Sequence, residues 1–464
     1  MDSVQDLIKR ARAAQQVVKS YTQSQIDEVC LAVAWEVYND ANIDKLARLA
    51  ADETGYGNYE SKVTKHKRKV GGVIQDVIGA VSVGLIERNE ETGISKYAKP
   101  VGVVCAILPA TNPTATAGSN AVSVIKGRNA VIFRPSSRAV KCSRMAAEFM
   151  RSGLRKVGAP EDLVLIAEGL DVPATNDLMH ACDVVVATGG APMVRAAYSS
   201  GTPSYGVGVG NAICIVAEDA NVEEAAEMVT SSKTFDNATS CSSENSLIIH
   251  ASLYDRMAAA LRKCGGHLCT PEERKILQET MWVPNAKGRV ALNPAIIAQS
   301  AQAIAKLADI KVAAGTNMLL VEGTMPADLD IFSQEKISPV LTLYKYTDFE
   351  AALEMYTRMA KRCGYGHSAG IHTYKRQYIE RMGELLDASR ITVRQPMAAA
   401  NGGHATNRMP CTTTLGCGTW GHNSTTENIN YRHFLNVTWL NEPVAARVLD
   451  EDRLWGAFWK KYGK

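Results

Sequence analysis

The segment from Val101 to Phe133 reads VGVVCAILPATNPTATAGSNAVSVIKGRNAVIF, and it decides the fold class. It starts with an apolar, β-branched run at Val101–Ile107 and ends with a second run at Ala130–Phe133, with a helical stretch between them. Apolar runs of this length joined by a helix are typical of buried parallel strands in β-α-β units. We therefore predict an α/β fold with a doubly wound parallel sheet, which binds ligands beyond the carboxyl ends of its strands.

Predicted helices and strands continue along the rest of the chain. Before Val101, apolar residues recur at three- and four-residue steps, which predicts helices from the start of the chain to about residue 90. Later runs predict strands at Leu163–Ile166, Val184–Ala187, Ile213–Val216, Ser246–His250 and Val340–Tyr344. Helices are predicted at Leu253–Lys263, Pro294–Leu307 and Phe349–Met359. Two α/β domains that face one another are implied.

Composition excludes several classes of protein. The 464 residues are 46% hydrophobic and 21% charged, which fits a soluble globular protein of two or three domains. The net charge is +3 with scattered basic residues, so neither nucleic acid nor an anionic membrane is an expected partner. The longest apolar run, Val101–Pro109, is about half of a membrane span. The acidic N-terminus has no signal-like apolar core, so we expect a cytoplasmic protein.

The 11 cysteines are an odd number spread through apolar segments, which indicates reduced thiols and not a disulfide framework. Cys264, His267 and Cys269 lie close enough in sequence to suggest a metal site. A structural zinc site needs four ligands, and no second Cys/His pair follows at ligand spacing. We therefore expect an ordinary surface loop and no metal.

One cysteine differs from the others in its surroundings. Cys241 lies in the small, polar segment FDNATSCSSENS, residues 235–246, just before a predicted strand. A thiol in such a loop is accessible to a carbonyl group that it could attack. The alternative from this loop alone is a packed cysteine at the edge of a strand.

Together with this loop, four further stretches resemble the aldehyde dehydrogenase superfamily, in the family's order. They are residues 108–113 (LPATNP), 134–137 (RPSS), 188–190 (TGG) and 335–340 (EKISPV). The resemblance implies that Cys241 forms a covalent thioester and that the Asn112 amide stabilises the oxyanion. It also implies a nicotinamide cofactor site formed by Ser136, Ser137, Arg138, Thr188, Gly189, Gly190, Gly208, Glu335 and Pro339.

The resemblance fixes the expected organisation as an aldehyde dehydrogenase-like fold. Residues 1–232 are expected to form the N-terminal helices and a Rossmann-like cofactor-binding domain, and residues 233–415 the catalytic cysteine domain. Residues 416–464 are expected to form an oligomerisation segment that packs on the cofactor domain or on a neighbouring subunit. A homodimer or homotetramer follows from this expectation.

A missing carboxylate indicates the branch of the family. Hydrolytic members have a glutamate in a Glu-Leu-Gly-Gly-Lys stretch that activates water. This chain has YGVGVGN at residues 205–211, where we expect Gly206 to replace that base. The chain therefore resembles the CoA-acylating branch, in which coenzyme A takes the acyl group. Within that branch it is similar to enzymes acting on sulfoacetaldehyde or succinate semialdehyde, of which we favour sulfoacetaldehyde. Propanal is a further alternative, and an inactive structural subunit is an alternative of another class.

Basic residues support an anionic aldehyde. Lys65, Lys67, Arg68 and Lys69 crowd one helical stretch, and Arg394 precedes Gln395-Pro396 on the expected wall of the site. Lys69, Arg394 and the Ser242 hydroxyl are our candidates for holding a sulfonate or carboxylate. The alternatives are a solvated helix face for residues 65–69 and an ion pair for Arg394.

Two assignments stay open between alternatives. Ser136, Ser137 and Arg138 follow a strand without an acidic residue, which favours NADP over NAD. His367 is either a base for the CoA thiol at the substrate site or an internal hydrogen-bonded histidine.

Overall fold

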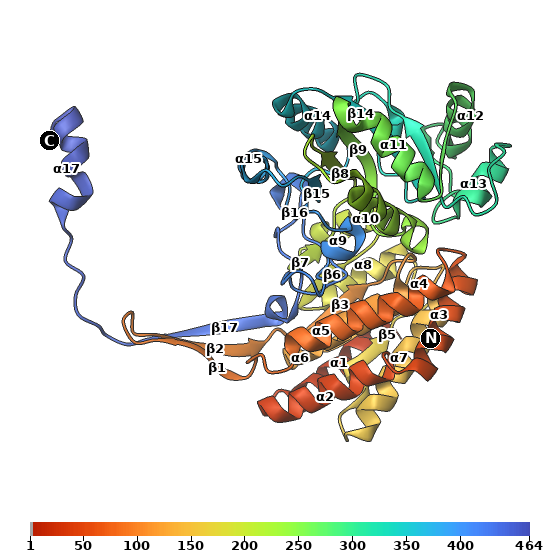
Figure 1. Cartoon of the computed structure of the whole chain (residues 1–464). Helices are drawn as coiled ribbons and strands as arrows, with labels where there is room; N and C mark the ends of the chain where they lie inside the picture. The colour runs from red at the N-terminus through yellow and green to blue at the C-terminus, as the bar shows by residue number, and fades with distance from the viewer. Residues whose placement is uncertain (1–2) are drawn as a thin grey trace.

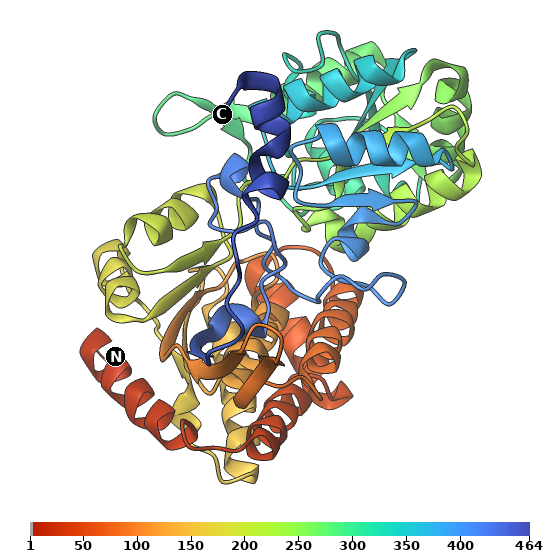
Figure 2. The same cartoon turned by 90° about the vertical axis from the view of Figure 1, so that its left-hand side faces the viewer.

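The structure is a computed structural model that describes residues 3–464. Two lobes lie one above the other, and a narrow arm, a three-stranded sheet, leaves the lower lobe toward the C-terminus (Figure 1). The turned view separates the lobes, with the N-terminal half of the chain in one, the green and cyan part in the other, and blue C-terminal segments that run back along the first (Figure 2). No helix among the described residues is long and apolar enough to cross a membrane.

Of the N-terminal helices, the first packs on strands of the first sheet, and most of the others pack on helices that cover this sheet. The segments are α1 (Val4–Val18), α2 (Gln23–Glu36), α3 (Asp40–Thr54), α4 (Tyr59–Lys65), a π-helical turn (His66–Val70) and α5 (Gly71–Val77). Side chains of Ser3, Thr22 and Asn39 cap the first three helices by accepting backbone N–H bonds. Helix ends at Val77, and residues 84–89 form a strand, so the expectation of helix up to residue 90 was wrong there.

The first sheet is parallel throughout, in the order β5-β4-β3-β6-β7. Its strands are β3 (Val103–Ile107), β4 (Ala130–Arg134), β5 (Val164–Ile166), β6 (Val184–Ala187) and β7 (Ser204–Gly206). Helices α6 (Pro113–Lys126), α7 (Val140–Lys156), α8 (Val172–Ala181) and α9 (Ala191–Ser199) connect them. Every residue of β3 is buried, as expected for a strand covered on both faces.

The second sheet is also parallel, in the order β10-β13-β14-β9-β8-β15-β16. Its strands are β8 (Ala212–Val216), β9 (Glu244–His250), β10 (Gly266–Leu268), β13 (Met318–Glu322), β14 (Val340–Tyr346), β15 (Ala369–His372) and β16 (Ile391–Val393). Its helices are α10 (Val222–Thr234), α11 (Tyr254–Lys263), α12 (Pro271–Met281), α13 (Ala301–Leu307), α14 (Phe349–Arg362), α15 (Arg376–Leu385) and α16 (Met397–Ala400). Two doubly wound parallel sheets are therefore present, as predicted.

Two details differ from the expected organisation. β8 pairs with β9 and β15, so the change of sheet precedes residue 212 and does not follow residue 232. We propose that the first unit ends near residue 211. The helix expected from Pro294 begins only at Ala301, because Ser300 caps it and residues 294–297 form a turn.

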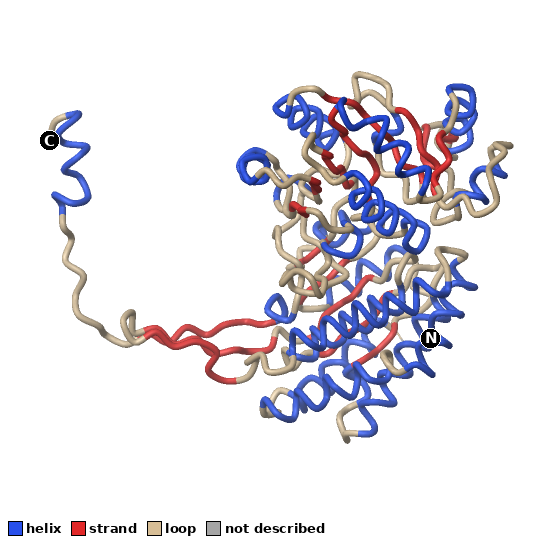
Figure 3. The backbone as a smooth tube through the Cα atoms, viewed as in Figure 1, coloured by secondary structure: helices blue, strands red, loops and turns tan. Residues whose placement is uncertain are grey.

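The C-terminal arm is built from segments far apart in sequence. β17 (Leu435–Asn441) pairs antiparallel with β2 (Ile94–Pro100), which pairs with β1 (Gly84–Asn89). These strands form the red part of the tube that projects from the lower lobe in Figure 3. A last helix, α17 (Glu451–Tyr462), lies at the far end of the arm and buries none of its residues (Figure 1). A separate hairpin joins β11 (Trp282–Pro284) and β12 (Val290–Leu292).

Candidate active site

A cavity of 540 Å³ lies where the carboxyl ends of the first sheet's strands meet the loop before β9. β3 leads into residues 108–112, and β6 leads into residues 188–190. Of the site residues predicted from the sequence, the cavity is lined by Lys69, Asn112, Ser136, Arg138, Thr188, Gly189, Gly190, Gly208, Cys241, Ser242 and Glu335. The fold therefore brings eleven predicted residues to one cavity, and four others, Ser137, Pro339, His367 and Arg394, are outside its lining.

Cys241 lines this cavity and contacts one histidine. The Nε2 atom of His367 lies 3.2 Å from the Sγ atom of Cys241, and Nδ1 of the same ring lies 2.8 Å from the Ser368 hydroxyl. Burial, with the nearby Arg390 guanidinium, lowers the pKa of His367 to about 3. Burial, with Glu335 and Cys417, raises the pKa of the Cys241 thiol to about 12. The resting pair is therefore a neutral thiol beside a neutral imidazole.

Asn112 occupies the N-cap position of α6 but does not cap it. Its side chain makes no capping hydrogen bond, and Pro113 follows at the first helical position, where no N–H donor is needed. The Asn112 side chain lines the same cavity as Cys241. Its amide is therefore available to an oxyanion formed on a carbonyl that Cys241 attacks.

Glycines replace side chains around the thiol. A Cβ atom at Gly210 would lie 2.3 Å from the Cys241 carbonyl oxygen and 2.8 Å from the Glu335 Oε1 atom. A Cβ atom at Gly206 would instead meet Val194 and Tyr198. The glycine packed against the nucleophile is therefore Gly210, whereas Gly206, which we expected in place of the hydrolytic glutamate, packs against α9. The register of a glycine-rich stretch could not be read from sequence alone.

Glu335 is the one acidic residue that lines the cavity among those described. Burial raises its pKa to about 8, against the opposing effect of Lys233. Glu244, three residues after Cys241, points away from the cavity and accepts the Met397 N–H at 3.1 Å. Glu244 is therefore not placed to activate a water molecule at Cys241, as the alternation of side chains along a strand predicts.

The cofactor side of the cavity holds donors and no carboxylate other than Glu335. α9 begins at Ala191, its N-cap residue Gly190 has no side chain to cap it, and a Cβ atom at Gly189 would meet nothing within 4 Å. An uncapped helix start beside open space suits a pyrophosphate. Ser136 and Arg138 line the same end, with the Arg138 guanidinium 5.7 Å from the ring of Tyr56. The residues present therefore fit a dinucleotide.

Two predicted cofactor residues lie elsewhere. Ser137 is exposed and outside the cavity lining. The Pro339 carbonyl accepts the Leu319 N–H at 2.9 Å, which ties β13 to the segment before β14. Ser137 and Pro339 flank residues that do line the cavity, and sequence proximity alone could not separate them from those neighbours.

The two cations predicted to bind the substrate, Lys69 and Arg394, lie in different places. Lys69 lines the cavity, and its ammonium donates to the Gly402 carbonyl at 2.9 Å. Burial lowers the pKa of Lys69 to about 8, and no carboxylate pairs with it among the described residues 3–464. Arg394 instead donates to the Thr373 carbonyl at 2.7 Å and lies 4.3 Å from the ring of Tyr374. Arg394 was expected at the substrate, but these contacts hold it away from the cavity.

Ser242 follows the nucleophile, and its hydroxyl is buried without a hydrogen-bond partner among the described residues. A buried polar atom without a partner is unfavourable, so this hydroxyl is available to a polar group of a bound substrate. Lys69 and Ser242 thus offer one charge and one hydroxyl in the same cavity.

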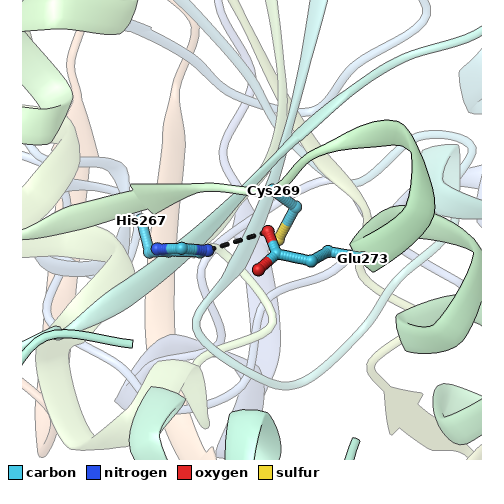
Figure 4. A group of neighbouring side chains, drawn as sticks. All are labelled: His267, Cys269 and Glu273. Atoms are coloured by element: carbon cyan, nitrogen blue, oxygen red, sulfur yellow. Dashed lines mark hydrogen bonds and ion pairs between the residues drawn. The ribbon is translucent and has the colours of Figure 1, made fainter. Parts of the chain in front are cut away.

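A second group of polar side chains lies at the edge of the other sheet. His267 and Cys269 come from β10 and the residue just after it, and Glu273 reaches back from the first turn of α12 (Figure 4). The Glu273 Oε2 atom accepts the Thr270 N–H at 2.9 Å and lies 3.0 Å from His267 Nε2. The contact with Thr270 belongs to a capping box at the start of α12, which accounts for the position of Glu273.

The parallel sheets, the cysteine loop and the cofactor cleft together define a class of enzyme. The chain belongs to the aldehyde dehydrogenase family, whose sequence model matches residues 1–406. Within that family it is a CoA-acylating aldehyde dehydrogenase, as its relatives and structural neighbours show.

Two relatives match almost the whole chain. It is 62% identical to the sulfoacetaldehyde dehydrogenase (acylating) of Bilophila wadsworthia over 100% of both chains. It is 39% identical to the succinate-semialdehyde dehydrogenase (acetylating) of Clostridium kluyveri, over 98% of this chain and 99% of the relative.

Solved structures agree with these relatives. An acetylating aldehyde dehydrogenase from Geobacillus thermoglucosidasius superposes with a TM-score of 0.91 at 34% identity, over 96% of this chain and 98% of the other. A propionaldehyde dehydrogenase from Rhodopseudomonas palustris with bound CoA and an acylated cysteine has a TM-score of 0.85 at 25% identity, over 95% and 97%.

Proposed function

We propose that the enzyme converts sulfoacetaldehyde, CoA and NADP⁺ into sulfoacetyl-CoA, NADPH and a proton. The observation that supports an anionic substrate is the position of Lys69. This cation lies in the cavity wall, and its described hydrogen bond is to a carbonyl group and not to a carboxylate. A cation in such a place favours a substrate that brings the missing negative charge. The 62% identical relative is named for the same aldehyde.

The covalent step follows from the pair of neutral groups. Cys241 attacks the aldehyde carbon as its proton moves to Nε2 of His367, which is 3.2 Å from Sγ. The Asn112 amide and the Cys241 backbone N–H donate to the oxyanion of the hemithioacetal. The bound nicotinamide supplies the acceptor for the hydride that leaves this carbon. The product on the protein is a thioester of Cys241.

The fate of the thioester depends on which nucleophile is activated next. Gly210 packs against Cys241 where no side chain fits, and Glu244 faces away. Neither can supply the carboxylate that hydrolysis needs. CoA then attacks the thioester, Cys241 leaves as the thiol, and sulfoacetyl-CoA departs.

Cofactor choice rests on the Ser136 and Arg138 end of the cavity. A 2′-phosphate is matched by hydroxyls and a guanidinium, whereas a free 2′-hydroxyl is usually matched by a carboxylate. Glu53 approaches this region from α3, but its two oxygens accept the N–H groups of Lys141 and Cys142. The balance favours NADP.

We also propose that the active form is a homo-oligomer. Trp439, Leu440, Leu454, Trp455 and Phe458 are 42–60% exposed along β17 and α17. A 12-residue helix that buries nothing is marginal in water, so a second copy would stabilise it. Light scattering on the full chain tests this, and a monomer would contradict it.

The experiment for the substrate compares three aldehydes. NADPH formation is followed with sulfoacetaldehyde, succinate semialdehyde and propanal, each with and without CoA. We expect the highest kcat/KM with sulfoacetaldehyde. Equal or higher kcat/KM with propanal would contradict an anionic substrate, and higher kcat/KM with succinate semialdehyde would move the assignment to that aldehyde, which the 39% identical relative favours.

A further inference from the structure

Two loops from different lobes must keep a fixed separation for the proposed chemistry. One loop follows β3 and carries Asn112, and the other precedes β9 and carries Cys241. An oxyanion donor acts only if it is held at the position where the charge develops. The structure must therefore contain an element that fixes one loop against the other.

One ammonium group contacts both loops. Lys65, at the end of α4, pairs with the Asp236 Oδ2 atom and donates to the Thr239 hydroxyl at 2.6 Å. Its Nζ atom also lies 3.4 Å from the Thr111 carbonyl oxygen. The Thr111 carbonyl belongs to the peptide unit whose N–H is that of Asn112. Lys65 is therefore a direct link between the nucleophile loop and the oxyanion loop.

The nucleophile loop needs such support, because its backbone is strained. Asp236, Asn237 and Ala238 have φ of 50°, 53° and 59°, a left-handed conformation that residues with a Cβ atom rarely adopt. Three such residues in succession persist only when their surroundings hold them. The Asp236 N–H donates to Ser61, and its Oδ1 accepts the Asn58 N–H at 2.8 Å. α4 and the residue before it thus hold the start of the loop.

Two lysines pair with the one carboxylate of Asp236. Asp236 is fully buried, and burial alone would raise its pKa, but Lys65 and Lys62 lower it below the usual range. Lys62 Nζ lies 3.5 Å from Asp236 Oδ2. No hydrogen bond joins Lys62 to Thr111 or Thr239 among the described residues 3–464. The two lysines therefore share the ion pair, while Lys65 alone reaches the oxyanion loop.

We infer that Lys65 is a positioning residue that sets the Asn112 amide against the Sγ atom of Cys241. This role differs from the one expected for residues 65–69, which was contact with an anionic substrate. It rests on the proposed roles of Cys241 and Asn112. It predicts that loss of Lys65 impairs the step that needs an oxyanion donor and spares a reaction of the thiol that needs none.

The experiment compares Lys65→Met with Lys62→Met in the full-length enzyme. Turnover is measured with the aldehyde that the wild-type enzyme uses best, and alkylation of Cys241 by iodoacetamide is measured on its peptide by mass spectrometry. We expect Lys65→Met to lower kcat by at least about tenfold, with KM and the alkylation rate within about threefold of wild type. Lys62→Met should lower kcat by less than about threefold.

Equal losses of kcat in the two variants would overturn the inference, because the effect would then come from the shared ion pair. A loss of alkylation rate as large as the loss of kcat in Lys65→Met would also overturn it. Lys65 would then act on the reactivity of the Cys241 thiol and not on the position of Asn112. Thr239→Val keeps both lysines and removes the 2.6 Å partner of Lys65. This variant retains the buried charges of Lys62, Lys65 and Asp236. We expect it to lower kcat several-fold and to leave the rate of Cys241 alkylation unchanged.

Coupling to Asn112 supplies an independent readout. If Lys65 acts through Asn112, then Lys65→Met should cost little when Asn112 is already alanine. Independent, multiplicative losses in the double variant would contradict the inference. No loss of kcat in Asn112→Ala alone would instead show that the proposed role of Asn112 is wrong, so the two failures are distinguishable.

Discussion

The Nε2 atom of His367 lies 3.2 Å from the Sγ atom of Cys241, and both groups are uncharged in the resting protein. A preformed thiolate and imidazolium would need a thiol pKa below that of the histidine, and burial sets the two in the opposite order. The thiol therefore loses its proton as it attacks the carbonyl and not before.

This order of pKa values predicts no resting thiolate. The ultraviolet thiolate absorbance of wild type minus that of Cys241→Ala should stay flat from about pH 6 to about pH 9. His367→Ala should lower kcat by about a hundredfold or more, as expected for loss of a general base. A titrating absorbance step near pH 6 would contradict the neutral pair.

Replacement of the nucleophile is the second prediction. Cys241→Ala should abolish turnover and leave the far-ultraviolet circular dichroism and the unfolding temperature close to those of wild type. The reason is that the thioester cannot form without the thiol. A loss of activity smaller than about tenfold would exclude Cys241 as the covalent residue, and Cys417→Ala is the matched control, since that thiol is buried and close enough to affect the pKa of Cys241.

The third prediction concerns the cofactor. Arg138→Ala should raise KM for NADP more than KM for NAD, by about tenfold or more, because only the 2′-phosphate accepts a charge-assisted hydrogen bond from this side chain. Ser137→Ala is the control, because Ser137 lies outside the cavity lining. Equal changes for both cofactors would show that Arg138 does not read the phosphate.

The fourth prediction separates Lys69 from Arg394. Lys69→Met should raise KM for the anionic aldehyde by about tenfold or more and leave KM for propanal unchanged, because a charge-assisted contact is lost. Arg394→Met should change neither, since its contacts are with Thr373 and Tyr374. If only Arg394→Met raised KM for the anionic aldehyde, Arg394 and not Lys69 would be the residue that binds the anion.

The pH dependence of the same contact can be worked out from the pKa of Lys69, which is lowered to about 8. Below this pH the ammonium is charged and attracts the anion, and above it the neutral amine does not. The ratio of kcat/KM for the anionic aldehyde to that for propanal should therefore fall as the pH rises through about 8 in wild type. In Lys69→Met the ratio should be independent of pH.

Much of the fold could be predicted from the sequence because buried parallel strands leave a local pattern. The apolar runs at residues 103–107 and 184–187 identified their strands directly. β8 was assigned to the wrong sheet, because its apolar sequence does not record which strands it pairs with. The β1-β2 hairpin was missed, because β1 is almost wholly exposed and neither strand has a regular apolar alternation in its sequence.

Part of the candidate site could also be predicted from local sequence, and part could not. Residues within short family-like stretches, such as Asn112 and Cys241, were predicted to share a site and do line one cavity. The contact of His367 with the thiol joins residues 126 positions apart, so no local pattern could show it. The Lys65 link also depends on left-handed residues at 236–238, which carry side chains and give no glycine signal.

The most direct test of the account is the dependence of NADPH formation on CoA with sulfoacetaldehyde as substrate. Without CoA, the enzyme should form about one equivalent of NADPH per site and stop, because neither Gly210 nor Glu244 provides a carboxylate that directs water to the Cys241 thioester. With CoA, turnover should continue and release sulfoacetyl-CoA. Sustained turnover without CoA, at a rate close to that with CoA and with sulfoacetate as the product, would contradict the account.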